Sequence, residues 1–306
     1  MANNLKASIS TMTPTQPILP AEQIRAGDAP LMSPPVQRPP ADLFARRADR
    51  LLRLADGHAM AGFLRLCAAI CQQQQALHDA SRLDPRAALE KLAEALTPQL
   101  PVPVQAALDL LLAQDAAALS RLAERLINGD YPADGPLFAA LPLLGAALQA
   151  QATRSVRQRP LPEPQSQEAR CPCCGGLPLA SLLLRGDSGH AQRYVVCSMC
   201  SHAWPVGRVR CLSCGNSRDL HYYSLAARDY LPPEPDHQRP HQARGAREVE
   251  ACDQCHGALK QISLLLDADA EAGADDLASL ALDLLAGEAG YARIGFNPLF
   301  LPGDPA

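Results

Sequence analysis

The strongest constraint in this sequence is a set of four Cys-x-x-Cys pairs in its second half. The eight cysteines concerned are Cys171 and Cys174, Cys197 and Cys200, Cys211 and Cys214, and Cys252 and Cys255. A two-residue gap lets one tight turn direct two thiolates at the same ion, and two such turns complete a tetrahedral site. The spacing therefore predicts two four-cysteine metal sites, for zinc or for rubredoxin-type iron.

The order in which the pairs combine is open at this point. Twenty-two residues separate Cys174 from Cys197, and thirty-seven separate Cys214 from Cys252, so each gap can hold a hairpin. Joining the first pair with the second and the third with the fourth gives two successive modules of the zinc-ribbon or rubredoxin type. Crossed pairings are also sterically feasible. Gly175 and Gly215 directly follow their pairs, where a turn often needs a positive φ.

Other uses of clustered cysteines fit less well. The N-terminus has no apolar run of signal-peptide length, and no stretch reaches the roughly 18 apolar residues of a membrane span. We therefore expect a cytoplasmic protein without a membrane span, in a compartment where disulfides are disfavoured. Thiol redox catalysis needs one reactive pair at a helix N-terminus, which four pairs match poorly. A four-cysteine iron–sulfur cluster stays open, although the close triple runs typical of clusters are absent.

The remaining cysteines and two nearby histidines are expected to have lesser roles. Cys173 lies inside the first turn and is interpreted as a spectator thiol. His202 and His256 follow the second and fourth pairs and are expected to support the ligands or lie on the surface. Cys67 and Cys71 are four residues apart on an apolar helical stripe, which is typical of small core residues.

Composition divides the chain into regions of different character. Residues 1–40 are rich in Pro, Ser, Thr and Gln and predict a mostly irregular tail. Apolar residues recur at three- and four-residue spacing over residues 41–155, which predicts an antiparallel helical bundle. A Pro-, Gln- and Arg-rich linker at 156–170 leads to two metal-binding β modules, at 171–210 and at 211–306, and the second includes a C-terminal helix. The predicted class is α+β.

Local signals set the expected elements. Asp84 and Pro85 predict a helix N-cap followed by Pro at the first helical position, and Asp275 is expected to cap the last helix. Pro232 to Arg247 predicts an exposed loop. The predicted helices cover about 43–55, 60–77, 84–96, 104–112, 116–127, 136–152 and 275–286, and the predicted strands cover 179–184, 193–196, 220–225 and 262–266.

No catalytic constellation stands out, because the sequence has no Gly-rich phosphate loop, nucleophile elbow or paired-acid signature. Four thiolates per ion also leave no open coordination position for a substrate. Residues 151–260 contain fourteen Lys and Arg against ten Asp and Glu. Two ions, each bound by four thiolates, would bring this region near neutral, whereas binding to phosphates needs a positive surplus. We expect neither an enzyme nor a nucleic-acid-binding protein.

Several motifs beyond the cysteines are shared with a known family. They are Cys171-Pro172-x-Cys174-Gly175, Arg193-Tyr194-x-x-Cys197-x-x-Cys200, Trp204, Arg208-Val209-x-Cys211-x-x-Cys214, Leu220-His221-Tyr222, Cys252-x-x-Cys255 with Leu259-Lys260, Asp275-Asp276-Leu277-Ala278-Ser279-Leu280, Gly290-Tyr291-Ala292-Arg293 and Asn297-Pro298. With these motifs the chain resembles the FdhE family, the formate dehydrogenase accessory proteins, over most of residues 171–303. The extra thiol of Cys173 and the long loop at 232–247 depart from the usual pattern.

The resemblance implies a cytoplasmic protein that binds iron and associates with the catalytic subunit of respiratory formate dehydrogenase, which needs it to become active. It also implies that the eight paired cysteines are the metal ligands and that the cofactors are two metal ions, with iron favoured over zinc. A homodimer is compatible with this interpretation. The alternative is a zinc-ribbon module that binds nucleic acid or another protein.

Overall fold

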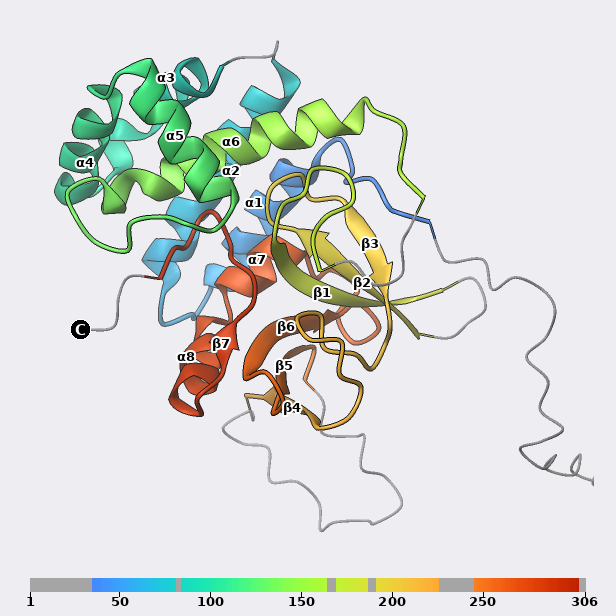
Figure 1. The fold of residues 1–306 in the computed structure, drawn as a ribbon. Coiled ribbons are helices and arrows are strands. Elements are labelled where there is room, and N and C mark those ends of the chain that lie inside the picture. The colour runs from blue at the N-terminus through green and yellow to red at the C-terminus, as the bar shows by residue number, and fades with distance from the viewer. Residues whose placement is uncertain (1–34, 81–83, 164–168, 187–190, 226–244, 303–306) are drawn as a thin grey trace, which may run out of the picture. The chain divides into compact units, whose positions relative to one another are not determined.

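The computed structural model describes residues 35–80, 84–163, 169–186, 191–225 and 245–302 (Figure 1). Most of the predicted Pro-rich tail and most of the predicted loop at 232–247 lie outside the described residues. The α+β class, with an N-terminal helical region followed by cysteine-bearing β structure, is confirmed.

The helical region comprises α1 (Leu43–Ala55), α2 (Ala61–Asp79), α3 (Pro85–Leu96), α4 (Val102–Leu112), α5 (Ala116–Ile127) and α6 (Leu141–Arg157), with 3₁₀ turns at Thr97–Gln99 and Phe138–Ala140. Asp84 caps α3 as predicted, because its carboxylate accepts a hydrogen bond from the Ala87 amide at 2.9 Å. The predicted helix at 136–152 is wrong at both ends. A 3₁₀ turn precedes α6, and α6 itself continues to Arg157, into the stretch expected to be linker.

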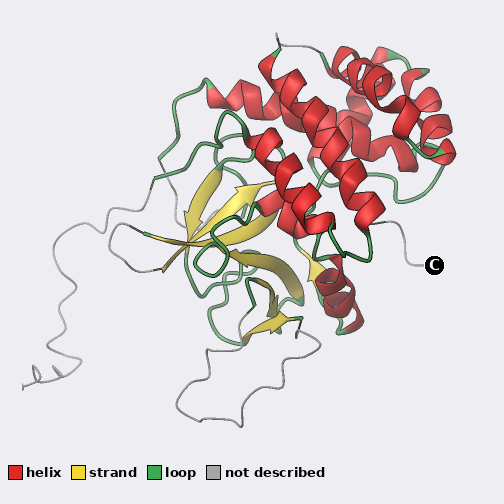
Figure 2. Ribbon diagram, turned by 180° about the vertical axis from the view of Figure 1, so that it is seen from behind, coloured by secondary structure: helices red, strands yellow, loops and turns green. Residues whose placement is uncertain are grey.

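One mixed sheet follows the helices, with the strand order β3-β2-β1-β6-β5-β4, and a short β7 pairs with β6. The strands are β1 (Pro178–Arg185), β2 (Ala191–Cys197), β3 (Ala203–Val206), β4 (Leu220–Ser224), β5 (Arg247–Cys252), β6 (Gly257–Ser263) and β7 (Ala292–Arg293). The predicted strand at 262–266 is wrong at both ends, since β6 begins at Gly257 and ends at Ser263, and β3, β5 and β7 were not predicted. The sheet is yellow in Figure 2.

The sheet consists of two three-stranded units of the same topology. In each unit a cysteine turn precedes the first strand, and a second cysteine turn joins the second strand to the third. Within each unit the neighbouring strands are antiparallel. The units join through β1 and β6, which run parallel, with Ser181 opposite Gln261. Both units therefore point the same way, and their cysteine turns lie at the same end of the sheet.

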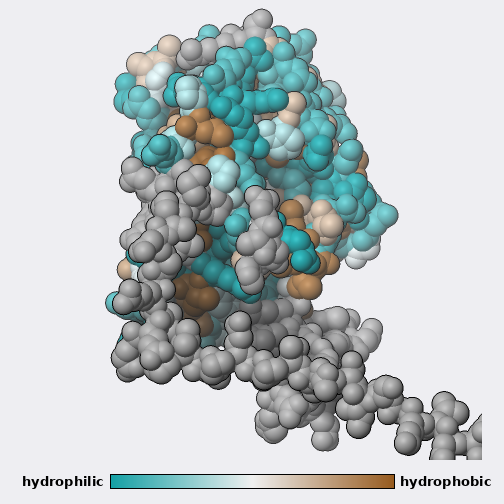
Figure 3. Space-filling model, turned by 90° about the vertical axis from the view of Figure 1, so that its right-hand side faces the viewer, coloured by the Kyte–Doolittle hydropathy of each residue, from teal (hydrophilic) through white to brown (hydrophobic). Residues whose placement is uncertain are grey.

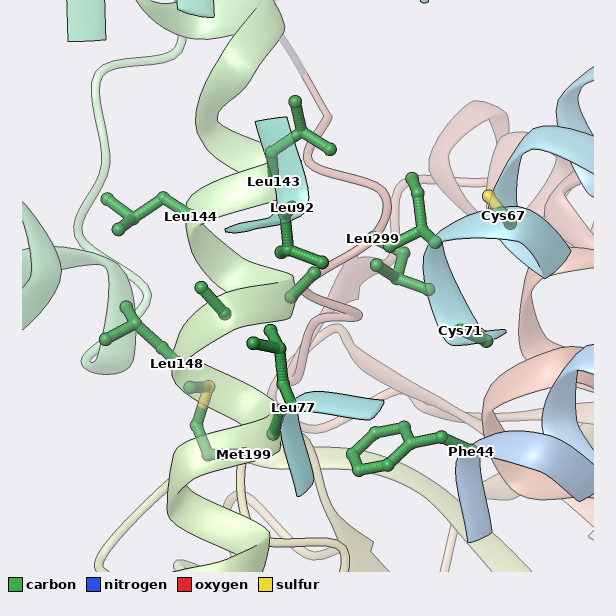
Figure 4. Packing of buried hydrophobic residues seen from close by; sticks show 14 of the residues in the cluster. Phe44, Cys67, Cys71, Leu77, Leu92, Leu143, Leu144, Leu148, Met199 and Leu299 are labelled. Carbon is green, nitrogen blue, oxygen red and sulfur yellow. The ribbon is translucent and has the colours of Figure 1, made fainter. Parts of the chain in front are cut away.

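A continuous apolar core connects the helices with the first unit of the sheet. It includes leucines of α2, α3 and α6 together with Met199 and Trp204 from the sheet unit. Figure 4 shows Met199 next to the α6 leucines, and it shows Cys67 and Cys71 on α2 within the same core. The prediction that these two cysteines are core residues is confirmed.

Buried ion pairs connect α1 with the C-terminal segment. Arg47 donates two hydrogen bonds to the Glu271 carboxylate, at 3.0 and 2.9 Å, and Arg50 donates two to Asp275, at 3.0 and 2.8 Å. Arg247 at the start of β5 also pairs with Asp275. The acidic partners lie at the start of α7 (Ala272–Leu277), which packs against both α1 and β1 (Figure 1). These pairs fix the first helix against the C-terminal half of the chain.

The predicted single helix at 275–286 is wrong in two respects. The segment forms α7 and α8 (Leu280–Glu288), and Glu271, not Asp275, caps the first of them by accepting a hydrogen bond from the Ala274 amide. Leu284 and Leu285, expected on the buried face, are exposed. The break between the helices changes the orientation of α8, so that Leu282 and Ala286 form its buried face.

Among the described residues, no helix is long and apolar enough to cross a membrane. On the face shown in Figure 3, the described surface is mainly hydrophilic, and its apolar residues form separate small patches.

Candidate metal centres

Each cysteine pair lies on a tight turn that is closed by backbone hydrogen bonds. The Gly175 amide donates to the Cys171 carbonyl at 2.8 Å, and the Gly215 amide donates to the Cys211 carbonyl at 3.0 Å. Both glycines have positive φ, of 74° and 78°, as predicted. In the other two turns a non-glycine residue takes the same conformation: Ser201 has φ 56° and His256 has φ 53°. The turns thus share one backbone shape.

The structure brings the eight cysteines together as two groups of four. Cys171, Cys174, Cys197 and Cys200 form the first cluster, and Cys211, Cys214, Cys252 and Cys255 form the second; within each, the sulfur atoms all lie within 4.8 Å of one another. The first pair thus joins the second and the third joins the fourth. This arrangement follows from the sheet, because each first strand begins beside the end of its antiparallel partner.

The sulfur–sulfur distances match a tetrahedral ion. They are 3.5 Å for Cys171 and Cys200 and 3.4 Å for Cys174 and Cys197. In the second cluster they are 3.6 Å for Cys211 and Cys255 and 3.7 Å for Cys214 and Cys252. Sulfurs placed about 2.3 Å from a central ion form a tetrahedron with edges of about 3.8 Å, whereas a disulfide bond measures about 2.05 Å. All eleven cysteines of the chain are described and none is in a disulfide.

The charges in the clusters favour a bound cation. Hydrogen bonding to Cys171, and then to Cys174 and Cys197, raises the pKa of Cys200 far above the usual thiol range, because neighbouring thiolates disfavour a further negative charge. Burial raises the pKa of Cys252, but hydrogen bonds from the amides of Cys255 and Gln254 and from the thiols of Cys214 and Cys211 together lower that pKa to about 7. A cation among the sulfurs would offset this repulsion and let all four thiols ionise. The donor set and its spacing therefore fit zinc or iron.

Side chains of α6 support the first cluster. Gln149 Nε2 donates to the Ser198 carbonyl at 2.6 Å, and Thr153 Oγ1 donates to the Met199 carbonyl at 3.3 Å. Both carbonyls belong to the turn between Cys197 and Cys200. The sequence interpretation missed Gln149 and Thr153; the available signal was two polar residues, four apart, on the face of the helix that is otherwise apolar.

The residues predicted to lie near the ligands take different positions. Cys173 lies beside the first cluster and is partly buried, outside the group of four. His202 is buried, with Nδ1 3.2 Å from the Cys200 carbonyl, and burial lowers its pKa. His256 is exposed and its ring lies 6.0 Å from that of Tyr291. Asp253, between the two cysteines of the fourth turn, accepts a hydrogen bond from the Tyr291 hydroxyl at 2.6 Å.

Comparison with known proteins identifies the family. Three models match the chain: "FdhE, N-terminal" at residues 33–88 and 81–169, "FdhE, central domain" at 170–208, and "FdhE, C-terminal domain" at 209–300. A curated "Protein FdhE homolog" of Pseudomonas aeruginosa is 35% identical over 319 residues, covering 94% of this chain and 98% of the relative. The chain belongs to the FdhE family.

Other FdhE proteins agree with this assignment. The "Protein FdhE" of Escherichia coli is 30% identical over 305 residues, covering 89% of this chain and 93% of the relative. The crystal structure of the FdhE protein from Pseudomonas aeruginosa superimposes with a TM-score of 0.70 at 34% identity, over 88% of this chain and 100% of that one. In this chain, the first cluster lies wholly in the match to the central domain and the second wholly in the match to the C-terminal domain.

Proposed function

We propose that this protein is a cytoplasmic accessory protein that holds one metal ion in each cluster and binds the catalytic subunit of respiratory formate dehydrogenase, allowing the active enzyme to form. The observation that carries the proposal is the family match over nearly the whole chain, together with two complete sets of four thiols at tetrahedral spacing. The family name supports the accessory role, and the thiols support the metal.

The proposed ligands are the eight cysteines of the two clusters, with Cys173 outside both sets. Iron, the metal we favour, would supply one-electron redox chemistry at such a site, whereas zinc would only hold the fold. Four thiolates fill a tetrahedral ion and leave no position for a substrate, so the proposal assigns no turnover to the protein. The chain's own contribution is to position the thiolates and to present a surface to the client.

The test is recovery of the client from cells. Tagged protein is purified without oxygen from its host, and the proteins that come with it are identified by mass spectrometry. The same purification is done with a Cys211→Ser, Cys214→Ser double variant. Cys173→Ser is the matched control, since it removes a thiol next to a cluster without touching either set of four. We expect a formate dehydrogenase catalytic subunit with the wild-type and control proteins and its loss with the double variant.

A different recovery result and an elemental analysis test the proposal further. Recovery of nucleic acid or an unrelated complex, without any dehydrogenase subunit, would favour a zinc-ribbon binding module. Elemental analysis of the same anaerobic sample would settle the metal. Iron near two equivalents per chain supports the favoured form, and two equivalents of zinc would reject iron while keeping the clusters as metal sites.

A further inference from the structure

The two clusters have the same backbone frame but differ in their surroundings. In the first, the turn from Cys197 to Cys200 is buried along its whole length, including Ser198 and Met199. In the second, the corresponding turn from Cys252 to Cys255 exposes Asp253 and Gln254. Equivalent positions of the repeated topology are therefore shielded in one unit and open in the other.

The first cluster is shielded because the helical region packs on it. Cys171, Cys197 and Cys200 belong to the apolar core shared with the helices, and Met199 inserts its side chain into that core (Figure 4). The hydrogen bonds from α6 to the Ser198 and Met199 carbonyls hold the turn against the helix. Displacing a ligand here would require the turn to leave the core.

The second cluster opens to solvent through Cys214. Cys214 is exposed, whereas Cys174, at the same position of the first cluster, is partly covered. A hollow of about 170 Å³ lies beside Cys214 and is lined by Cys211, Leu212 and Arg210, among others. None of the second cluster's cysteines belongs to the core shared with the helices, as far as the described residues extend. An incoming thiol or chelator can therefore reach a ligand without unfolding the chain.

We propose that the second cluster is the exchange site of this protein, which releases and accepts its ion through Cys214, while the first cluster is a permanent structural site. The inference rests on the metal-binding part of the proposed function. Exchange is a ligand substitution: an incoming thiol binds the ion as a thiolate, the bond from Cys214 Sγ breaks, and the proton of the incoming thiol passes through water to Cys214. The same substitution at Cys211, Cys252 and Cys255 then frees the ion. No electron is transferred.

Metal release measures the difference directly. The purified full chain, reduced and loaded with zinc without oxygen, is mixed with an excess of the chromophoric chelator 4-(2-pyridylazo)resorcinol. We expect two phases of one equivalent each, with the fast phase at least tenfold faster than the slow one. Cys214→Ser should eliminate or further accelerate the fast phase and leave the slow phase and the circular dichroism spectrum unchanged. Cys174→Ser is its matched partner in the first cluster and should lower the melting temperature.

Mapping the released thiols keeps the test decisive if Cys174→Ser fails to fold. After one equivalent of zinc has left the wild-type chain, a short pulse of iodoacetamide is followed by peptide mass spectrometry. Labelling of Cys211, Cys214, Cys252 and Cys255 ahead of the first cluster's cysteines supports the inference. Release of both equivalents at one rate, or earlier labelling of the first cluster, overturns it and leaves metal binding standing. A chain that retains no zinc overturns the metal-binding proposal as well.

Discussion

Arg47 offers the sharpest test of how the two halves of the chain are joined. Its side chain is 1% exposed and its partner Glu271 is 14% exposed. The guanidinium donates two hydrogen bonds to that carboxylate and a third, at 3.0 Å, to Gln149 Oε1. Gln149 in turn donates to the Ser198 carbonyl in the first cluster. Arg47 therefore links α1, α6, α7 and the turn from Cys197 to Cys200 through one buried network.

Replacement of Arg47 by Met keeps much of the volume and removes the charge and the donors. Removing one partner of a buried ion pair costs about 3–5 kcal/mol, because the other charge stays buried without compensation. With a urea slope of about 3 kcal/mol/M, the unfolding midpoint should fall by roughly 1–1.7 M. The assay is urea unfolding of the metal-loaded protein, followed by circular dichroism and by Trp204 fluorescence.

The neighbouring residue provides the control. Arg46 is 65% exposed and, within the described part of the chain, pairs with the exposed Asp42, so Arg46→Met should leave the midpoint unchanged. Adding Glu271→Gln to Arg47→Met should recover part of the loss, since the uncompensated charge disappears. Equal midpoints for the two Arg variants would refute the argument that the buried network holds the halves together. If the double variant loses as much stability as the two single variants together, the charge explanation is refuted, but the argument that the buried network holds the halves together is not.

Two further predictions concern packing and pH. Gly145→Ala should destabilise the protein by about 1–3 kcal/mol, because a Cβ there would lie 2.8 Å from the Pro298 carbonyl oxygen. Gly287→Ala, which has open space around it, should stabilise the protein by about 0.5–1 kcal/mol. Urea midpoints of the two variants that move in the same direction would contradict this. Burial raises the pKa of Asp276, but Arg293 and other cations hold this pKa below the usual range. The ionised carboxylate therefore stabilises the fold above about pH 4, and this contribution is lost as the pH falls through the lowered pKa. Asp276→Asn should therefore be less stable at pH 7 and lose less stability between pH 5 and 2, and an unchanged acid dependence of the midpoint would count against it.

The sequence predicts the cysteine turns of the two clusters because their geometry is local. A Cys-x-x-Cys turn needs only its own residues and a positive φ at the next position, which Gly175 and Gly215 signal directly. The α3 cap is local in the same sense, since Asp84 and the Ala87 amide are three residues apart. The local sequence does not decide which cysteine pairs combine, because this depends on how the strands pair.

The missed strand β5 and the wrongly placed helix cap depend on distant partners. β5 contains Glu248 and Glu250, both buried, and the apolar residues that alternate with them, Val249 and Ala251, form too short a pattern to predict a strand. Glu250 becomes acceptable there because Arg193 of β2 pairs with it at 2.9 Å, and that arginine is 57 positions away in sequence. Asp275 misled the prediction for a similar reason, since its carboxylate accepts hydrogen bonds from Arg50, Arg247 and the preceding Glu271 amide and does not cap a helix that begins after it.

The sheet makes the two clusters equivalent, and the helices make them different. Because β1 and β6 run parallel, both clusters form at the same end of the sheet, each beside the start of its unit's first strand. The cluster centres are separated by three strand spacings of about 4.8 Å, or roughly 14 Å. Had the units met antiparallel, the clusters would lie at opposite ends. With both at one end, the position of α6 over the turn at Ser198 is enough to bury one centre and leave its neighbour open.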